Sequence, residues 1–149
     1  MGSDDLQDQL SHYISFVEKV LKPKLLNAES AANVVRAEIT DYEELTRRLN
    51  QRIAAGISEE SLGSVVDIGY KTIFCNAVVK DPSKIFVKVG LGFHVEMELN
   101  EASRFAKKRI SYLRKNRLAE KEAEIKEING HIQSASIILD QLHAEMKRS

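Results

Sequence analysis

A stretch of alternating apolar residues, Val65–Leu99, lies between two long segments in which apolar residues recur every three or four positions. Alternation places successive side chains on opposite faces of a β-strand, whereas spacing by three and four places them along one face of an α-helix. The pattern therefore predicts an α+β fold in one domain. Residues 6–55 and 100–147 are expected to be helical and residues 65–99 to form the β-region between them.

The β-region divides at turn residues. Asp81–Ser83 predicts a turn, because proline presets φ and the side chains of aspartate and serine bond nearby backbone groups. Gly69, Gly90 and Gly92 mark the other reversals, where a positive φ or a β-bulge is expected. Two hairpins leave exposed edges and are marginally stable alone, so we expect the sheet to continue into other chains. The predicted strands lie near Val65–Tyr70, Ile73–Val79, Ile85–Val89 and Phe93–Leu99.

Apolar residues of these strands are the candidates for an oligomerisation surface, in which they supply a shared β core. A charge at Val87 or Val95 is expected to disrupt oligomers. Cys75 alternates with these residues, which favours a buried small hydrophobic residue over a nucleophile. The oligomerisation candidates are Val66, Ile68, Ile73, Val79, Ile85, Val87, Phe93, Val95 and Met97.

The two helical segments carry the apolar pattern of an antiparallel coiled coil. Gly56 is expected to cap the end of the first helix and Asn100 the start of the second. The pattern slips in phase between Leu113 and Leu118, which resembles a stutter and predicts a local change in winding. Facing residues of the folded-back helices have numbers that sum to about 155. The predicted buried residues of the first helix are Leu6, Leu10, Tyr13, Val17, Val20, Leu25, Ala28, Ala32, Val35, Ile39, Tyr42, Leu49 and Ile53.

Pro23 and Gly130 lie at nearly the same height in this register. A proline inside a helix costs roughly 3 kcal/mol, and a glycine costs about 1 kcal/mol relative to alanine. One hypothesis is a hinge at this height. It predicts that protection from hydrogen exchange differs between the residues above and below the hinge. The alternative is that Pro23 starts a new helix within its first turn, where proline is well tolerated.

The 22 basic and 22 acidic residues cancel, so no global field favours a nucleic-acid or membrane partner. One basic run faces Glu38, Asp41, Glu43 and Glu44 of the first helix in the predicted register, which favours ion pairing across the coiled coil. A nucleic-acid patch is the alternative interpretation of this run. It consists of Arg104, Lys107, Lys108, Arg109, Arg114, Lys115 and Arg117.

No residues form a pattern typical of an enzyme. One cysteine cannot form a disulfide within the chain, and the four histidines share no metal-ligand spacing. Gly90-Leu91-Gly92 lacks the later glycine and the lysine of a phosphate-binding loop. No apolar run approaches the roughly 20 residues of a membrane span, and no signal peptide is recognisable. We therefore expect an intracellular, non-enzymatic protein that uses no cofactor and no metal.

The order helix, two hairpins, helix resembles the prefoldin α-class subunits. The resemblance extends from about His12 to Leu142 and is most specific in the β-region, because any coiled coil matches the helical part. Pro23 departs from the uninterrupted helix of that family. The runs that carry the resemblance are Val66-Asp67-Ile68-Gly69, Asp81-Pro82-Ser83-Lys84-Ile85, Val89-Gly90-Leu91-Gly92-Phe93 and Leu99-Asn100-Glu101-Ala102.

The resemblance implies a subunit of an ATP-independent chaperone. In prefoldins, two α-type and four β-type subunits join their hairpins into a double β-barrel, and the tips of the helical arms hold non-native proteins such as actin and tubulin. It implies β-type subunits, and a URI-like α subunit in a prefoldin-like complex, as partners, and a location in the cytoplasm and nucleus. The alternative functions are a transcription-related coiled-coil adaptor and a homo-oligomeric structural coiled coil.

Apolar residues near the ends of the two helical segments are the candidates for client binding. Most of them also fit regular heptad steps, so packing within the coiled coil is the alternative interpretation. Ile14 and Ile138 lie beside the main apolar stripe, so we expect them to be more exposed. The client-binding candidates are Leu6, Leu10, Tyr13, Ile14, Val17, Ile138, Leu139, Leu142 and Met146.

Overall fold

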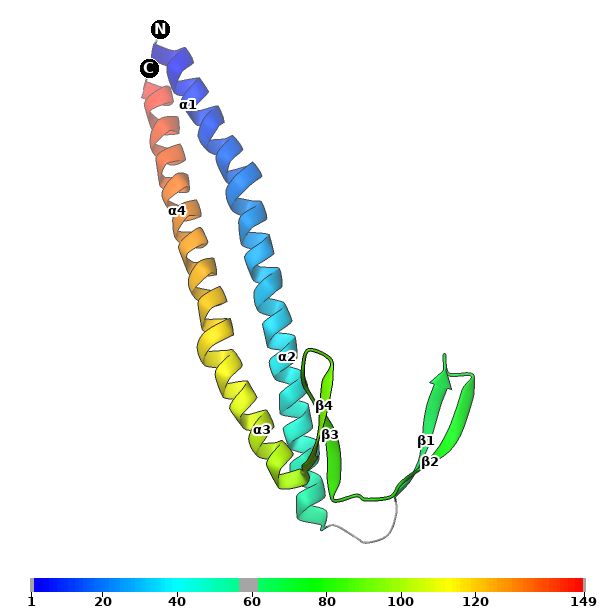
Figure 1. Cartoon of the computed structure of the whole chain (residues 1–149). Coiled ribbons are helices and arrows are strands. Elements are labelled where there is room, and N and C mark those ends of the chain that lie inside the picture. Colours follow the sequence, from blue (N-terminus) through cyan, green and yellow to red (C-terminus); the bar gives the residue numbers. More distant parts are fainter. Residues whose placement is uncertain (1, 57–61, 149) are drawn as a thin grey trace. The chain divides into compact units, whose positions relative to one another are not determined.

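The computed structural model describes residues 2–56 and 62–148, in which one helical segment precedes two β-hairpins in the sequence and a second helical segment follows them (Figure 1). This order confirms the predicted α+β fold. The elements are α1 (Gly2–Phe16), the π-helical turn η1 (Val17–Leu21), α2 (Lys22–Ala55), β1 (Leu62–Gly69), β2 (Ile73–Val79), β3 (Lys84–Gly90), β4 (Phe93–Glu98), α3 (Leu99–Tyr112), the π-helical turn η2 (Leu113–Leu118) and α4 (Ala119–Arg148).

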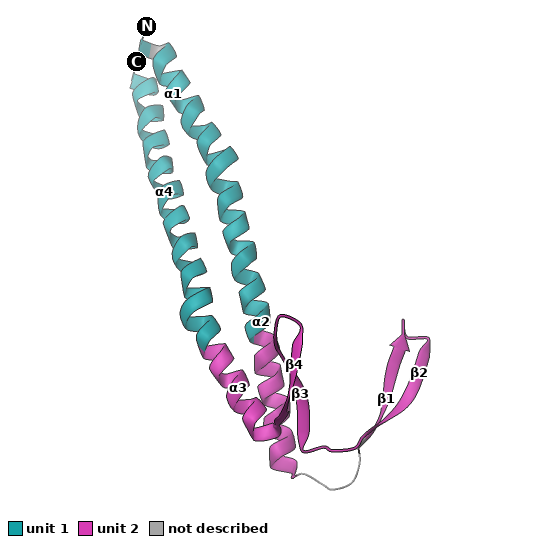
Figure 2. Ribbon diagram, in the orientation of Figure 1, with its two compact units in different colours: residues 1–39, 112–149 teal, residues 40–111 magenta. Residues whose placement is uncertain are grey.

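The elements fall into two compact units (Figure 2). Unit 1 contains residues 1–39 and 112–149, and unit 2 contains residues 40–111. In unit 1, Val17 and Leu21 of η1 pack against Ile132 and Ala135 of α4. Further along the same helices, the buried residues include two alanines, whose small side chains allow the helix axes to approach closely. These further buried residues are Ala28, Ala32, Val35, Ile39, Leu113 and Ile128.

Contacts within each unit confirm the predicted register. In unit 1, the contact of Val17 with Ala135 and the ion pair of Arg36 Nη2 with Glu122 Oε1, at 3.3 Å, both join residues whose numbers sum to about 155. In unit 2, the Ser103 hydroxyl donates to Asn50 Oδ1 at 3.3 Å, which gives a similar sum. Residue numbers therefore rise along one helix as they fall along the other, so the helices of each unit are antiparallel.

The π-helical turn η1 lies just before Pro23 in the first helical segment. The Lys22 N–H donates to the Val17 carbonyl, which is five residues earlier rather than four. Pro23, which has no N–H, then falls in the first turn of α2, where proline is tolerated. The helical segment continues unbroken from Gly2 to Ala55, so Pro23 does not start a separate helix, and the hinge stays a prediction. The same turn corrects the predicted stripe, since Leu21 is buried and Val20 is 46% exposed.

The second π-helical turn, η2, covers the predicted phase slip. Leu113 and Leu118 are five residues apart, a step that would rotate the apolar stripe away from its partner in a regular α-helix. A π-helical turn contains about one more residue, so both side chains stay on the packed face. Leu113 is fully buried and Leu118 is half-buried, which confirms the predicted change in winding.

In unit 2, the β3–β4 hairpin packs one face against helices. Val87 lies opposite Val95 in the antiparallel register, and Ile85 lies opposite Met97, so these four share a face. Ile85, Val87 and Met97 pack against Leu45, Leu49 and Ile53 of α2 and against Leu99, Ala102 and Phe105 of α3.

The reversals differ in how closely they follow the prediction. Asp81 accepts hydrogen bonds from the backbone N–H and the hydroxyl of Ser83, which confirms the predicted turn and lowers the pKa of the Asp81 carboxyl. Gly90 and Gly92 have positive φ as expected. At the first reversal the positive φ values fall on Tyr70 and Lys71 instead of on the preceding glycine, and the register shifts there by a β-bulge.

The helix ends lie close to the expected residues. Gly56 has a φ of +80° and donates its N–H to the Ile53 carbonyl, so it caps the first helix as predicted. The second helix begins at Leu99, one residue before the predicted cap at Asn100. The Leu99 N–H donates to the Ser83 carbonyl, which ties the start of α3 to the turn between the hairpins.

Glu44 corrects part of the predicted charge pairing. Its carboxylate accepts hydrogen bonds from Arg47 Nε at 2.8 Å and from Arg48 Nε at 2.7 Å, both on its own helix. These two guanidinium groups lower the pKa of Glu44 to about 2. Arginines three and four residues away are always within reach on a helix surface, so they compete well with partners on a facing helix.

Gly130 lies exposed within α4, and a Cβ added there meets no atom within 4 Å. We expect Gly130→Ala to stabilise the chain by about 1 kcal/mol, because alanine loses less backbone entropy on folding. Thermal unfolding followed by circular dichroism measures this as a rise of a few degrees in the midpoint. Gly90→Ala is the matched control and is expected to lower the midpoint, since Gly90 has a φ of +126°. An unchanged or lower midpoint for Gly130→Ala contradicts this expectation.

Candidate functional site

Most of the predicted oligomerisation residues are exposed in this chain. Six of them have between 41% and 67% of their surface accessible: Val66, Ile68, Ile73, Val79, Phe93 and Val95. Four of these six lie on the β1–β2 hairpin. The hairpin is antiparallel, with Val66 opposite Cys75 and Ser64 opposite Ala77.

The β1–β2 hairpin is apolar on both faces. Val65, Phe74 and Val78 are also exposed, and they alternate with the predicted residues, so they lie on the opposite face. Sequence reasoning assigned only one face of these strands and missed these three residues. The available signal was the nearly continuous apolar run of β2, which is typical of strands that are covered on both sides.

Cys75 is exposed, so the prediction of a buried small side chain is wrong for the chain alone. Its neighbours on the same face of the hairpin, Val66 and Val79, are exposed as well. The pattern identified a face that suits burial, but nothing within this chain covers that face among the described residues.

The other three oligomerisation candidates, Ile85, Val87 and Met97, belong to the packed core of unit 2. Val87 is 4% exposed. A charge at Val87 therefore acts first on the folding of unit 2, and its effect on oligomers does not report on an exposed interface. Val95 lies opposite Val87 and is partly exposed, so it stays a predicted oligomerisation residue.

A second apolar surface lies in unit 1, where a groove of about 350 Å³ runs between the helices. It contains two predicted client-binding residues, Tyr13 and Ile138. Sequence reasoning missed Phe16 as a candidate and placed Val20 inside the coiled coil, although both side chains are exposed. The complete lining is Tyr13, Phe16, Val20, Leu21, Lys24, His131, Ser134, Ala135 and Ile138.

The remaining client-binding candidates are distributed between the packed stripe and its border. Val17 and Leu142 are buried. Ile14 is exposed as expected, whereas Ile138 is half-buried. The half-buried candidates are Leu6, Leu10, Tyr13, Leu139 and Met146.

Within residues 2–56 and 62–148, no three His, Cys, Asp or Glu side chains are grouped so that they could hold a metal ion. In the same part of the chain, no helix combines the length and the hydropathy needed to cross a membrane. The notable features of the surface are thus the β1–β2 hairpin and the groove of unit 1.

Comparisons with known proteins place this arrangement in a family. Residues 21–145 match the prefoldin subunit family. A UXT homolog from Nematostella vectensis is 34% identical over 124 residues, which cover 82% of this chain and 77% of that protein. Human protein UXT is 30% identical over 106 residues, which cover 71% of this chain and 66% of that protein.

Among solved structures, a chain of the filamentous PFD from Methanocaldococcus jannaschii aligns with a TM-score of 0.45 and 21% identity, over 76% of this chain and 95% of that one. The sequence matches cover both helical segments and both hairpins. The chain therefore belongs to the prefoldin family and is similar to its UXT members.

Proposed function

We propose that this chain is a subunit of a hetero-oligomeric, prefoldin-type chaperone or co-chaperone that acts by binding and not by catalysis. The single observation that carries the proposal is the β1–β2 hairpin, which exposes apolar side chains on both faces. An isolated two-stranded hairpin is marginally stable in water, so this one needs strands from other subunits.

The free energy available from covering the hairpin is large. Among the described side chains of this hairpin, the exposed large apolar ones include Val65, Val66, Ile68, Ile73, Phe74, Val78 and Val79. At about 1.5–3 kcal/mol for each fully buried side chain of this kind, completing their burial contributes on the order of 5–10 kcal/mol. This range is similar to the whole stability of a typical domain, which is about 5–15 kcal/mol. We therefore expect other subunits to cover the apolar surface of the hairpin.

Membership of the prefoldin family suggests the partners. We propose β-type prefoldin subunits as the neighbours of the β1–β2 hairpin, and a URI-like α subunit as the second α-type chain of the same assembly. We further propose that the assembly acts in the cytoplasm and nucleus, without ATP.

The groove of unit 1 is the proposed site for non-native client proteins. Phe16 and Val20 expose apolar surface along it, and Lys24 and His131 lie at its polar border. A groove lined mostly by apolar side chains suits many extended chains, which agrees with broad, weak recognition.

The test mixes the chain with β-type prefoldin subunits and adds chemically unfolded actin, without ATP. Light scattering then measures aggregation of the actin. We expect the complex to suppress aggregation, and Phe16→Ser with Val20→Ser to weaken the suppression several-fold. The matched control is Glu29→Ser with Asn33→Ser, which changes two exposed residues of the same unit outside the groove. Normal aggregation with the complex present, together with binding of a few folded proteins only, contradicts the holdase and favours the adaptor.

A further inference from the structure

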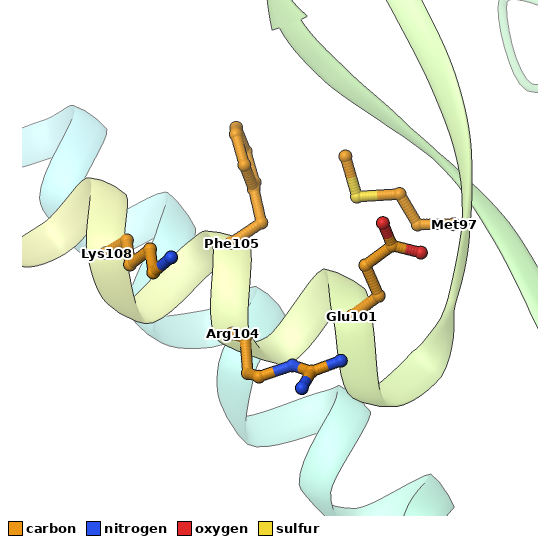
Figure 3. A pocket seen from close by; sticks show the side chains of 5 residues that line it. All are labelled: Met97, Glu101, Arg104, Phe105 and Lys108. Atoms are coloured by element: carbon orange, nitrogen blue, oxygen red, sulfur yellow. The ribbon is translucent and has the colours of Figure 1, made fainter.

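A pocket of about 340 Å³ lies between β4 and α3, entirely within unit 2 (Figure 3). Met97 enters it from β4, and the other four residues come from consecutive turns of α3. In Figure 3, Met97 and Phe105 extend into the same open space, Glu101 lies beside Met97, and Arg104 extends from the other edge of α3 toward the side of Glu101. The complete lining is Met97, Glu101, Arg104, Phe105 and Lys108.

The apolar floor of the pocket is held in place from behind. Met97 and Phe105 both pack against the buried cluster of unit 2. The ring of Phe105 also meets the edge of the Tyr42 ring, with centroids 6.3 Å apart. A floor that is already ordered loses little conformational entropy when a ligand binds to it.

The cations of the pocket are available for a ligand. Arg104 and Lys108 are exposed and four residues apart, so they lie side by side on α3. Within the described residues, neither side chain takes part in an ion pair or a hydrogen bond. An arginine fork and a lysine ammonium next to an apolar floor are complementary to carboxylates beside an apolar group.

The strand side of the pocket has the opposite charge. Glu101 also borders a neighbouring hollow that is lined by Lys84, Glu96, Met97 and Glu98. The surface therefore changes from basic along α3 to acidic beside β4, with Met97 between the two. A ligand with carboxylates at the strand side meets repulsion there, whereas carboxylates at the α3 side meet attraction.

We propose that this pocket binds a short acidic segment of a partner protein, in which one apolar side chain is flanked by carboxylates on one side. The apolar side chain lies on Met97 and Phe105, and the carboxylates pair with Arg104 and Lys108. Glu101 sets the direction of the segment by excluding acidic residues from the strand side. This site uses neither the β1–β2 hairpin nor the groove of unit 1, so it is independent of the proposed function.

The test is fluorescence polarisation with the full chain and a labelled peptide that has three glutamates followed by a leucine and two serines. We expect Arg104→Gln with Lys108→Gln to weaken binding about tenfold, because two charge-assisted contacts are lost. Glu101→Gln is expected to strengthen binding several-fold, an effect that damage to the fold cannot produce. Lys115→Gln with Arg117→Gln is the matched control and removes the same charge from exposed positions outside the pocket.

Further peptides separate this site from general charge attraction. A peptide with glycine in place of the leucine, and one with glutamines in place of the glutamates, are both expected to bind at least several-fold more weakly. The proposal is overturned if the control variant weakens binding as much as the pocket variant, or if Glu101→Gln leaves affinity unchanged. It is also overturned if a single-stranded oligonucleotide competes with the peptide and depends on the same two cations, since the surface is then a phosphate site.

Discussion

Ile68→Lys combined with Val78→Lys is expected to abolish assembly with β-type prefoldin subunits while the chain itself stays folded. Both side chains are exposed, at 63% and 62%, so the lone chain loses little packing when they change. In an assembly that covers the β1–β2 hairpin, the two ammonium groups lose their water without gaining a partner. A penalty of about 3 kcal/mol or more raises the dissociation constant over a hundredfold.

Sedimentation velocity of the mixed subunits measures this loss, and circular dichroism of the isolated variant confirms its helices. Thr72→Lys is the control, since it adds one positive charge to the exposed turn of the same hairpin. It is expected to assemble normally. If the double variant assembles as well as the wild type, the β1–β2 hairpin is not the interface.

Val87→Asp is expected to have the largest effect on folding, with a loss of about 3–5 kcal/mol in the free energy of unfolding of unit 2. Val87 is 4% exposed and packs in the cluster formed with Leu49, Leu99 and Ala102. A carboxylate there is buried without a partner, which is among the most destabilising substitutions.

Phe86→Asp gives a direct comparison, because it makes the same substitution at the adjacent residue on the opposite face of β3. Phe86 is 70% exposed and lies opposite Glu96, so the lone chain is expected to lose only about 1 kcal/mol, from the lower strand propensity of aspartate and its repulsion by Glu96. Urea unfolding followed by circular dichroism measures both variants. Equal losses for the two contradict the placement of this hairpin against α2 and α3.

Patterns that depend on local geometry were predictable from the sequence. The alternation of apolar and polar residues in Phe93–Glu98 predicted a strand and its buried face, because a shift of one residue moves every side chain to the other face. The slip between Leu113 and Leu118 predicted altered winding, since only a local change in helical period keeps both on one face. The structure contains a π-helical turn at that place.

Features that depend on competition between partners were not predictable. Val20 and Leu21 both fit steps of three or four from Val17, and the π-helical turn before Pro23 decides that Leu21 is buried. In the predicted register, Glu44 could pair with cations of the second helical segment or with arginines of its own helix. The structure pairs it with Arg47 and Arg48 of its own helix. The second apolar face of β2 is a different case, because the nearly continuous apolar run of Ile73–Val79 indicated it and only the alternating residues were assigned.

The most direct test of the central proposal is the mass of the chain by light scattering, alone and after mixing with β-type prefoldin subunits. We predict a rise to the mass of a six-chain complex that contains this chain. A mass that stays at the value of the isolated chain with every β-type subunit contradicts the proposed assembly.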